Sequence, residues 1–122
     1  MRKRFLAMLF LPMLAGAAPG MAQAGGSAGN VTGDAQAAKA LIAEHCIKCH
    51  VAPGFPLGKQ QPAAGAPSFA EIAANPARYS DRQIAAFLRQ PHYPMQGFVL
   101  SRRDIANILA YIHQLREAGG GK

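Results

Sequence analysis

Cys46-Ile47-Lys48-Cys49-His50 is the stretch of this 122-residue sequence that decides its fold. It ends a segment, residues 34–49, in which small and apolar residues recur at helical spacing and Asp34 is placed to cap the first turn. Cys46 and Cys49 are three residues apart, nearly one helical turn, so both thiols face the same side of that helix. The segment therefore presents two thiols and the adjacent imidazole of His50 to one partner.

The pattern C-x-x-C-H is the attachment sequence for a c-type haem. Two thiols on one face can form thioether bonds to the two vinyl groups of one haem, and His50 then lies under the iron as the proximal ligand. We therefore expect one haem c, with its iron, bound covalently through Cys46 and Cys49. The second ring nitrogen of His50 should donate to a backbone carbonyl that fixes its tautomer and basicity.

Three other interpretations of the cysteines are open. A structural disulfide between them would close a very short loop and add little stability. Zinc needs four ligands, and only the isolated His45, His92 and His113 lie outside the motif. A thiol–disulfide switch should follow a strand at a helix N-terminus, whereas this motif ends a helix. Each of these is less consistent with the spacing than haem attachment.

Residues 1–24 have the features of a secretory signal peptide, with three basic residues, an apolar run and a small-residue cleavage site after Ala24. The alternative is an uncleaved membrane anchor. A cleaved signal is favoured over it because the apolar run is interrupted by Pro12 and is shorter than the roughly twenty residues of a membrane-spanning helix. We expect an exported, periplasmic protein. Cleavage removes Arg2, Lys3 and Arg4 and lowers the formal charge from +7 to +4. The remaining cations are too scattered for a nucleic-acid binder, and an acidic protein partner fits them better.

Met95 is the only methionine left after cleavage, and it lies in a Pro-bearing loop rather than on an apolar helix stripe. We therefore expect its thioether to be the sixth ligand of the iron, opposite His50. The alternatives are His92, three residues away, and an open sixth position. A His/Met pair closes the iron to small substrates and raises its reduction potential, which favours electron exchange over catalysis.

The rest of the sequence predicts one small all-α domain, residues 34–117, of three to four helices around the haem. It lacks alternating strand patterns and internal repeats. A flexible lead-in, residues 25–33, precedes it and a disordered tail, residues 118–122, follows it. The expected elements are helices at 34–49, 80–90 and 101–117, a short helical turn at 68–75, and loops at 51–66 and 90–100. The capping serines would be Ser68 and Ser80, the latter in a capping box with Gln83.

From residue 34 to 116 the sequence resembles the class I monohaem cytochromes c of bacteria, through the C-x-x-C-H motif, Met95 and the helix around residues 107–112. The resemblance implies that Ala38 and Ile42 on the first helix meet Ile108 and Tyr111 on the last. It also implies that a proline carbonyl, which we assign to Pro67, accepts the hydrogen bond from His50.

Further candidates for the haem surroundings follow from composition. Apolar candidates for the pocket are Phe55, Phe69, Phe87, Tyr93 and Phe98, with Phe69 and Phe98 the strongest. Five arginines flank the segments around Met95 and would steer an acidic redox partner if they surround the haem edge: Arg78, Arg82, Arg89, Arg102 and Arg103.

The expected function is that of a soluble periplasmic electron carrier, not an enzyme, which shuttles between redox partner proteins. One alternative is a cytochrome subunit held permanently in a dehydrogenase or oxidase complex. The other is a haem sensor or small peroxidase with a labile sixth ligand. Carbon monoxide binding to the reduced protein distinguishes the last from the first two.

Overall fold

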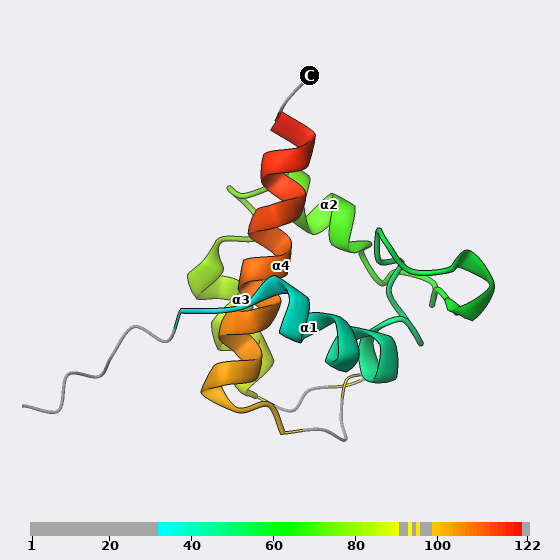
Figure 1. Cartoon of the computed structure of the whole chain (residues 1–122), viewed down its shortest axis with the longest axis horizontal. Coiled ribbons are helices and arrows are strands. Elements are labelled where there is room, and N and C mark those ends of the chain that lie inside the picture. Colours follow the sequence, from blue (N-terminus) through cyan, green and yellow to red (C-terminus); the bar gives the residue numbers. More distant parts are fainter. Residues whose placement is uncertain (1–31, 91–92, 94, 96–98, 121–122) are drawn as a thin grey trace, which may run out of the picture.

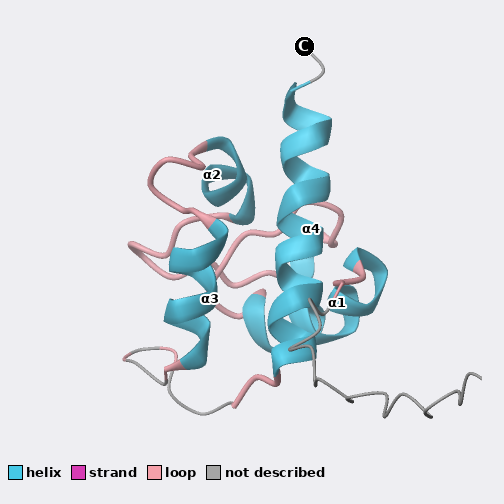
Figure 2. Cartoon of the chain, turned by 90° about the vertical axis from the view of Figure 1, so that its left-hand side faces the viewer, coloured by secondary structure: helices cyan, strands magenta, loops and turns pink. Residues whose placement is uncertain are grey.

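A computed structural model describes residues 32–90, 93, 95 and 99–120 of the chain. Four α-helices and two shorter helical turns make up its regular structure, and the described residues contain no strand (Figures 1 and 2). In chain order they are α1 (Ala35–Leu41), the π-helical turn η1 (Ile42–Cys46), the 3₁₀ turn η2 (Leu57–Lys59), α2 (Phe69–Ala74), α3 (Asp81–Arg89) and α4 (Arg102–Gly120). The expected all-α class is confirmed.

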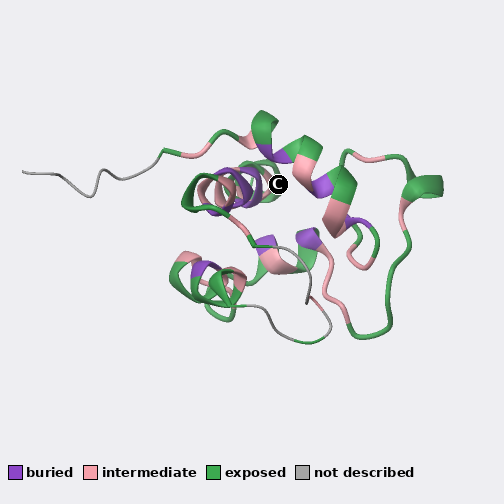
Figure 3. Ribbon diagram, turned by 90° about the horizontal axis from the view of Figure 1, so that it is seen from below, coloured by how far each residue is buried: buried purple, intermediate pink, exposed green. Residues whose placement is uncertain are grey.

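The long C-terminal helix α4 organises the domain. It lies between α1 and α3, and α2 also packs against it (Figures 1 and 2). Viewed from below, the buried residues of these helices turn towards each other and the exposed residues turn outwards (Figure 3). Ala38, Ile42, Ile108 and Tyr111, the four residues expected where the first and last helices cross, are all buried in one apolar cluster. The expected packing of the first helix on the last is therefore present.

Serine or aspartate side chains start each α-helix. The carboxylate of Asp34 accepts from the amide of Gln36, as expected for an N-cap. Ser68 and Ser80 both form complete capping boxes, with Glu71 and Gln83 respectively. At the start of α4, Ser101 and Asp104 exchange the same pair of hydrogen bonds. Three of these four capping residues, Asp34, Ser68 and Ser80, were expected from local sequence alone.

Two helix boundaries differ from the expected ones. The first helix does not run unbroken to Cys49: its regular part ends at Leu41, and the next turn widens so that the amide of Ile47 donates to the carbonyl of Ile42 at 3.1 Å. The last helix continues to Gly120 instead of ending near Glu117. No proline follows to stop it, and continuing the helix pairs carbonyls that would otherwise need water.

The segment just before α1 lies against α4. The amide of Asp34 donates to the side-chain oxygen of the buried Asn107 at 2.8 Å. Gly33 approaches so closely that a Cβ added there would lie 1.8 Å from the carbonyl oxygen of Ala106. These contacts fix where the first helix starts on the last. Among the described residues no helix has the length and apolar character needed to cross a membrane.

Candidate functional site

A cavity of about 610 Å³ opens between the helices, and its wall is predominantly apolar. Cys46, Cys49 and His50 contribute to one part of this wall and Met95 to another. Its volume is within the range of about 300–1,000 Å³ that small-molecule and cofactor sites span. The structure thus brings both thiols, the imidazole and the thioether to one cavity.

The widened turn η1 sets the direction of the cysteines. It ends at Cys46, whose carbonyl then accepts from the amides of both Cys49 and His50, at 3.1 and 2.9 Å. Between the cysteines, Ile47 is buried in the core and anchors the motif. A helical spacing of three and a buried anchor together place both thiols on the cavity side. The sequence pattern predicted the shared side but not the widened turn.

Burial raises the pKa of the Cys46 thiol to about 11. A reactive redox cysteine needs a lowered pKa, because the thiolate is the nucleophile. The environment of Cys46 therefore disfavours the thiol–disulfide alternative. The same buried environment is compatible with a cysteine sulfur that forms a thioether bond in the apolar cavity wall.

His50 has one ring nitrogen held by the backbone. Its Nδ1 lies 2.6 Å from the carbonyl oxygen of Pro67, the residue assigned from sequence. A carbonyl oxygen only accepts, so Nδ1 carries the hydrogen and the lone pair is on Nε2. Phe69 packs edge-on against the ring, with centroids 5.9 Å apart. The imidazole is therefore in the tautomer that a metal ligand requires.

The long loop between residues 51 and 66 is tied back onto the motif. The amides of Gln61 and Ala63 donate to the carbonyls of Ile47 and Cys49, at 2.8 and 2.9 Å. The side chain of Gln60 fastens the loop internally, bonding to Ala52 N and O and to Phe55 O. Gln60 was not identified from the sequence, because no local pattern in a Pro- and Gly-rich stretch distinguishes a glutamine whose side chain holds the loop together.

The aromatic candidates divide between cavity and core. Phe69, Phe87 and Tyr93 line the cavity. Phe55 is not among the lining residues and instead packs edge-on against Tyr111, with centroids 6.2 Å apart. Its position in the loop places it over α4, so as a pocket candidate it was wrong. Phe98 and the rival ligand His92 are outside the described residues.

Among the residues of the cavity wall that were not expected from sequence, three have polar side-chain groups: His45, Tyr79 and Gln83. Of the five arginines, Arg78 lines the cavity with its guanidinium 5.3 Å from the centroid of the Tyr79 ring. The other four, Arg82, Arg89, Arg102 and Arg103, are exposed on α3 and α4. Only one expected cation therefore reaches the cavity wall.

Comparison with known proteins decides the family. The sequence profile named Cytochrome c matches residues 35–116, about two thirds of the chain, and these residues contain the whole cavity wall. The chain belongs to the cytochrome c family. A curated relative, cytochrome c-552 of Bradyrhizobium diazoefficiens, is 36% identical over 96 residues, which cover 79% of this chain and 88% of the relative. No solved structure matches the chain significantly.

Membership of the cytochrome c family brings a covalently attached haem c with its iron and makes the chain a haem-based electron-transfer protein, acting on redox partner proteins. The residues present fit that group. The cavity is apolar and offers two thiols, one imidazole with its lone pair on Nε2, and one thioether. Thiols can form the covalent attachment, and imidazole and thioether groups are both known protein ligands of haem iron.

Proposed function

We propose that this cytochrome is an exported, monohaem carrier whose iron is bound by His50 and Met95 and which shuttles electrons between proteins. The observation that carries the proposal is that one apolar cavity is lined by His50, Met95 and both thiols of the attachment motif. The haem, when bound, supplies one-electron exchange between ferrous and ferric iron. The chain's own residues decide its ligation, its solvent access and its partner.

Cys46 and Cys49 would hold the group covalently, and so keep it in place through repeated encounters. His50 would ligate through Nε2, because Nδ1 donates its hydrogen to Pro67. That hydrogen bond also fixes the orientation of the imidazole ring. Met95, half-buried in the cavity wall, would supply the second protein ligand through its sulfur. A closed iron supports electron transfer rather than sensing or peroxidase chemistry.

Export would deliver the chain to the compartment where haem is attached to reduced thiols. Residues 1–24 carry the basic, apolar and small-residue regions of a signal peptide. Secretion of a haem-bearing product that begins after Ala24 supports this part of the proposal, and a haem-bearing product that retains residues 1–24 contradicts it.

Met95→Ala tests the ligation. We expect covalent haem to remain and the ferrous variant to bind carbon monoxide without prior unfolding, because a six-coordinate iron becomes open. Leu100→Ala is the matched control: Leu100 also lines the cavity and is half-buried, but it offers no ligand atom. Carbon monoxide binding to the wild-type protein to the same extent as to Met95→Ala contradicts the proposal and favours a sensor or peroxidase.

A further inference from the structure

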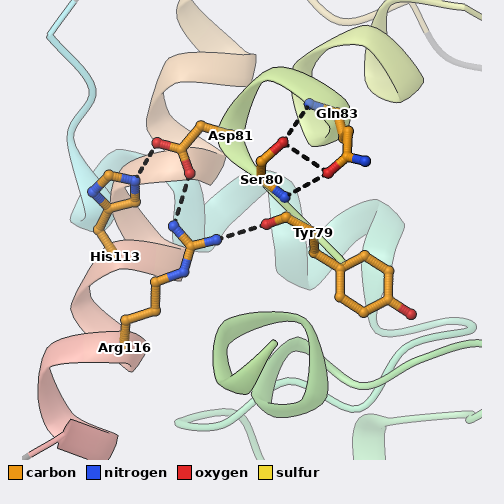
Figure 4. Close-up of polar contacts among 6 residues, drawn as sticks. All are labelled: Tyr79, Ser80, Asp81, Gln83, His113 and Arg116. Carbon is orange, nitrogen blue, oxygen red and sulfur yellow. Dashed lines mark hydrogen bonds and ion pairs between the residues drawn. The ribbon is translucent and has the colours of Figure 1, made fainter. Parts of the chain in front are cut away.

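The side chains of Asp81, His113 and Arg116 join the start of α3 to the C-terminal half of α4 (Figure 4). Nε2 of His113 lies 2.6 Å from Oδ2 of Asp81, and Nη1 of Arg116 donates to Oδ1 of the same carboxylate at 2.8 Å. Asp81 is the first residue of α3. The cluster therefore fixes this end of α3 on α4.

Arg116 makes a second contact that the other two residues do not. Its Nη2 donates to the backbone carbonyl of Tyr79 at 2.8 Å, so one guanidinium spans two acceptors that are two residues apart (Figure 4). The side chain of Arg116 is only 21% exposed, and its Nε is buried without a hydrogen-bond partner among the described residues. A planar fork that is mostly buried holds its acceptors in a fixed geometry.

Tyr79 connects this clamp, the pair of hydrogen bonds from Arg116 to Tyr79 and Asp81, to the haem cavity. Its side chain lines the cavity, and in Figure 4 its ring points away from Arg116. Tyr79 is not part of a helix: it lies between the end of α2 and the start of α3, where its amide donates to the carbonyl of Asn75 at 2.8 Å. The contact with Arg116 ties its carbonyl to α4.

We propose that Arg116 is a positioning residue for electron transfer. By holding the carbonyl of Tyr79 and the carboxylate of Asp81, it keeps the Tyr79 ring in the cavity wall and limits the access of water to the haem. Ferric haem carries one more positive charge than ferrous haem, so water stabilises the ferric form and lowers the reduction potential. The proposal rests on haem occupying the cavity and is independent of which residue provides the sixth ligand.

The test is the reduction potential of Arg116→Lys. Lysine keeps the positive charge but a single ammonium cannot reproduce the fork between two acceptors. We expect the potential to shift to more negative values. Lys39→Arg, an exchange of cation type at an exposed position of α1, is the control and should leave the potential unchanged. A wild-type potential in Arg116→Lys would show that the charge alone matters and would overturn the proposal.

A double-mutant comparison separates positioning from stability. Once Tyr79 is replaced by Ala, Arg116 has no ring to position, so Arg116→Lys should no longer shift the potential in the Tyr79→Ala background. A shift of undiminished size in that background overturns the proposal, whatever happens to the melting temperature. If Arg116→Lys does not fold, Asp81→Ala, which removes one of the two acceptors, should give a smaller negative shift, and no shift there counts against the proposal.

The far-red band of methionine-ligated ferric haem is recorded for every variant. Its absence from the wild-type protein would contradict Met95 ligation while leaving the comparison of potentials readable.

Discussion

At the scale of single residues, the position of the first helix on the last depends on two close contacts. Asn107 is buried, and its side-chain oxygen accepts from the amide of Asp34, 73 residues earlier in the chain. Beside it, the backbone of Gly33 lies against the carbonyl of Ala106 with no room for a side chain. A glycine and a buried amide therefore set the start of α1.

Gly33→Ala should destabilise the protein. The new Cβ would lie 1.8 Å from a backbone oxygen of α4, which cannot move aside, so the segment must withdraw and the bond from Asp34 to Asn107 weakens. We expect the free energy of unfolding to fall by about 1–3 kcal/mol. Gly58→Ala, where nothing lies within 4 Å of the added Cβ, should change it by less than about 0.5 kcal/mol. Denaturant titration of both variants measures this, and equal effects would contradict the argument.

At the scale of elements, helices α3 and α4 are started by their own serines and joined by the ionic cluster of Asp81, His113 and Arg116. Ser101 accepts from the amide of Asp104, whose carboxylate accepts from Ser101 in return. These hydrogen bonds lower the pKa of Asp104. The start of the last helix is thus fixed by hydrogen bonds between Ser101 and Asp104.

Ser101→Ala should lower the free energy of unfolding by about 1 kcal/mol, because the amide of Asp104 in the first turn of α4 loses its acceptor. Ser101→Thr, which keeps the hydroxyl, should recover most of the loss. Thermal unfolding followed by circular dichroism gives the comparison. If the threonine variant is as unstable as the alanine variant, the hydroxyl is not responsible.

Acidification should weaken the junction of α3 and α4. Partial burial raises the pKa of Asp81, but hydrogen bonds and charges from Arg116 and His113 outweigh it, and the pKa is lowered overall. Ionised Asp81 therefore contributes to the free energy of unfolding above the unfolded-state pKa of about 4. This contribution is lost as the pH falls through the lower folded-state pKa. Asp81 is 43% exposed, so solvent limits the contribution to about 1 kcal/mol or less. Asp81→Asn should be less stable than wild type at pH 7, and the difference should shrink as the pH falls below the unfolded-state pKa of about 4. A difference that does not change with pH contradicts this assignment.

Local sequence signals predicted the elements well and their junctions less well. The capping residues Asp34, Ser68 and Ser80 were readable because each acts within three or four residues. The widened turn at Ile42–Cys46 was not, because its helical periodicity resembles that of a regular helix. The clamp of Arg116 on Tyr79 joins residues 37 positions apart, and no local pattern specifies such a contact.

The candidate site shows the same difference between residues marked by local sequence signals and residues whose roles depend on long-range contacts. The attachment residues Cys46, Cys49 and His50 and the isolated Met95 were read from the sequence pattern, Pro67 was assigned through the family resemblance, and all five line the cavity. Gln60, Tyr79 and Arg116 could not be singled out, since their roles depend on where the long loop and the α2–α3 connection fold. Phe55 was assigned to the pocket because it is aromatic and near the motif, but the loop carries it to Tyr111.

At the scale of the whole molecule, exposed arginines are concentrated near the segments that surround Met95. Arg102 and Arg103 occupy the first turn of α4, where the helix dipole disfavours cations. The neighbouring Leu100 lines the cavity, so this turn is close to the site. Cations at an unfavourable position near a redox site are consistent with steering of an acidic partner.

Steering can be tested with an anionic oxidant before the natural partner is identified. The rate of oxidation of the ferrous protein by ferricyanide should fall as ionic strength rises, because screening weakens the attraction to the arginines. Replacing Arg102 and Arg103 together by Gln should slow the reaction at low salt on the order of twofold and flatten its salt dependence. Lys39→Gln and Lys59→Gln, exposed charges on α1 and η2, are the controls. An equal effect of the controls would show that only net charge matters.

Binding of one covalently attached haem by His50 and Met95 can be checked in the optical spectrum of the air-oxidised, exported protein. Ferric iron with a methionine sulfur bound shows a weak far-red band. We expect this band in the wild-type protein and its loss in Met95→Ala, with covalent haem retained. Covalent haem without the band in the wild-type protein, or an unchanged band in Met95→Ala, would contradict it.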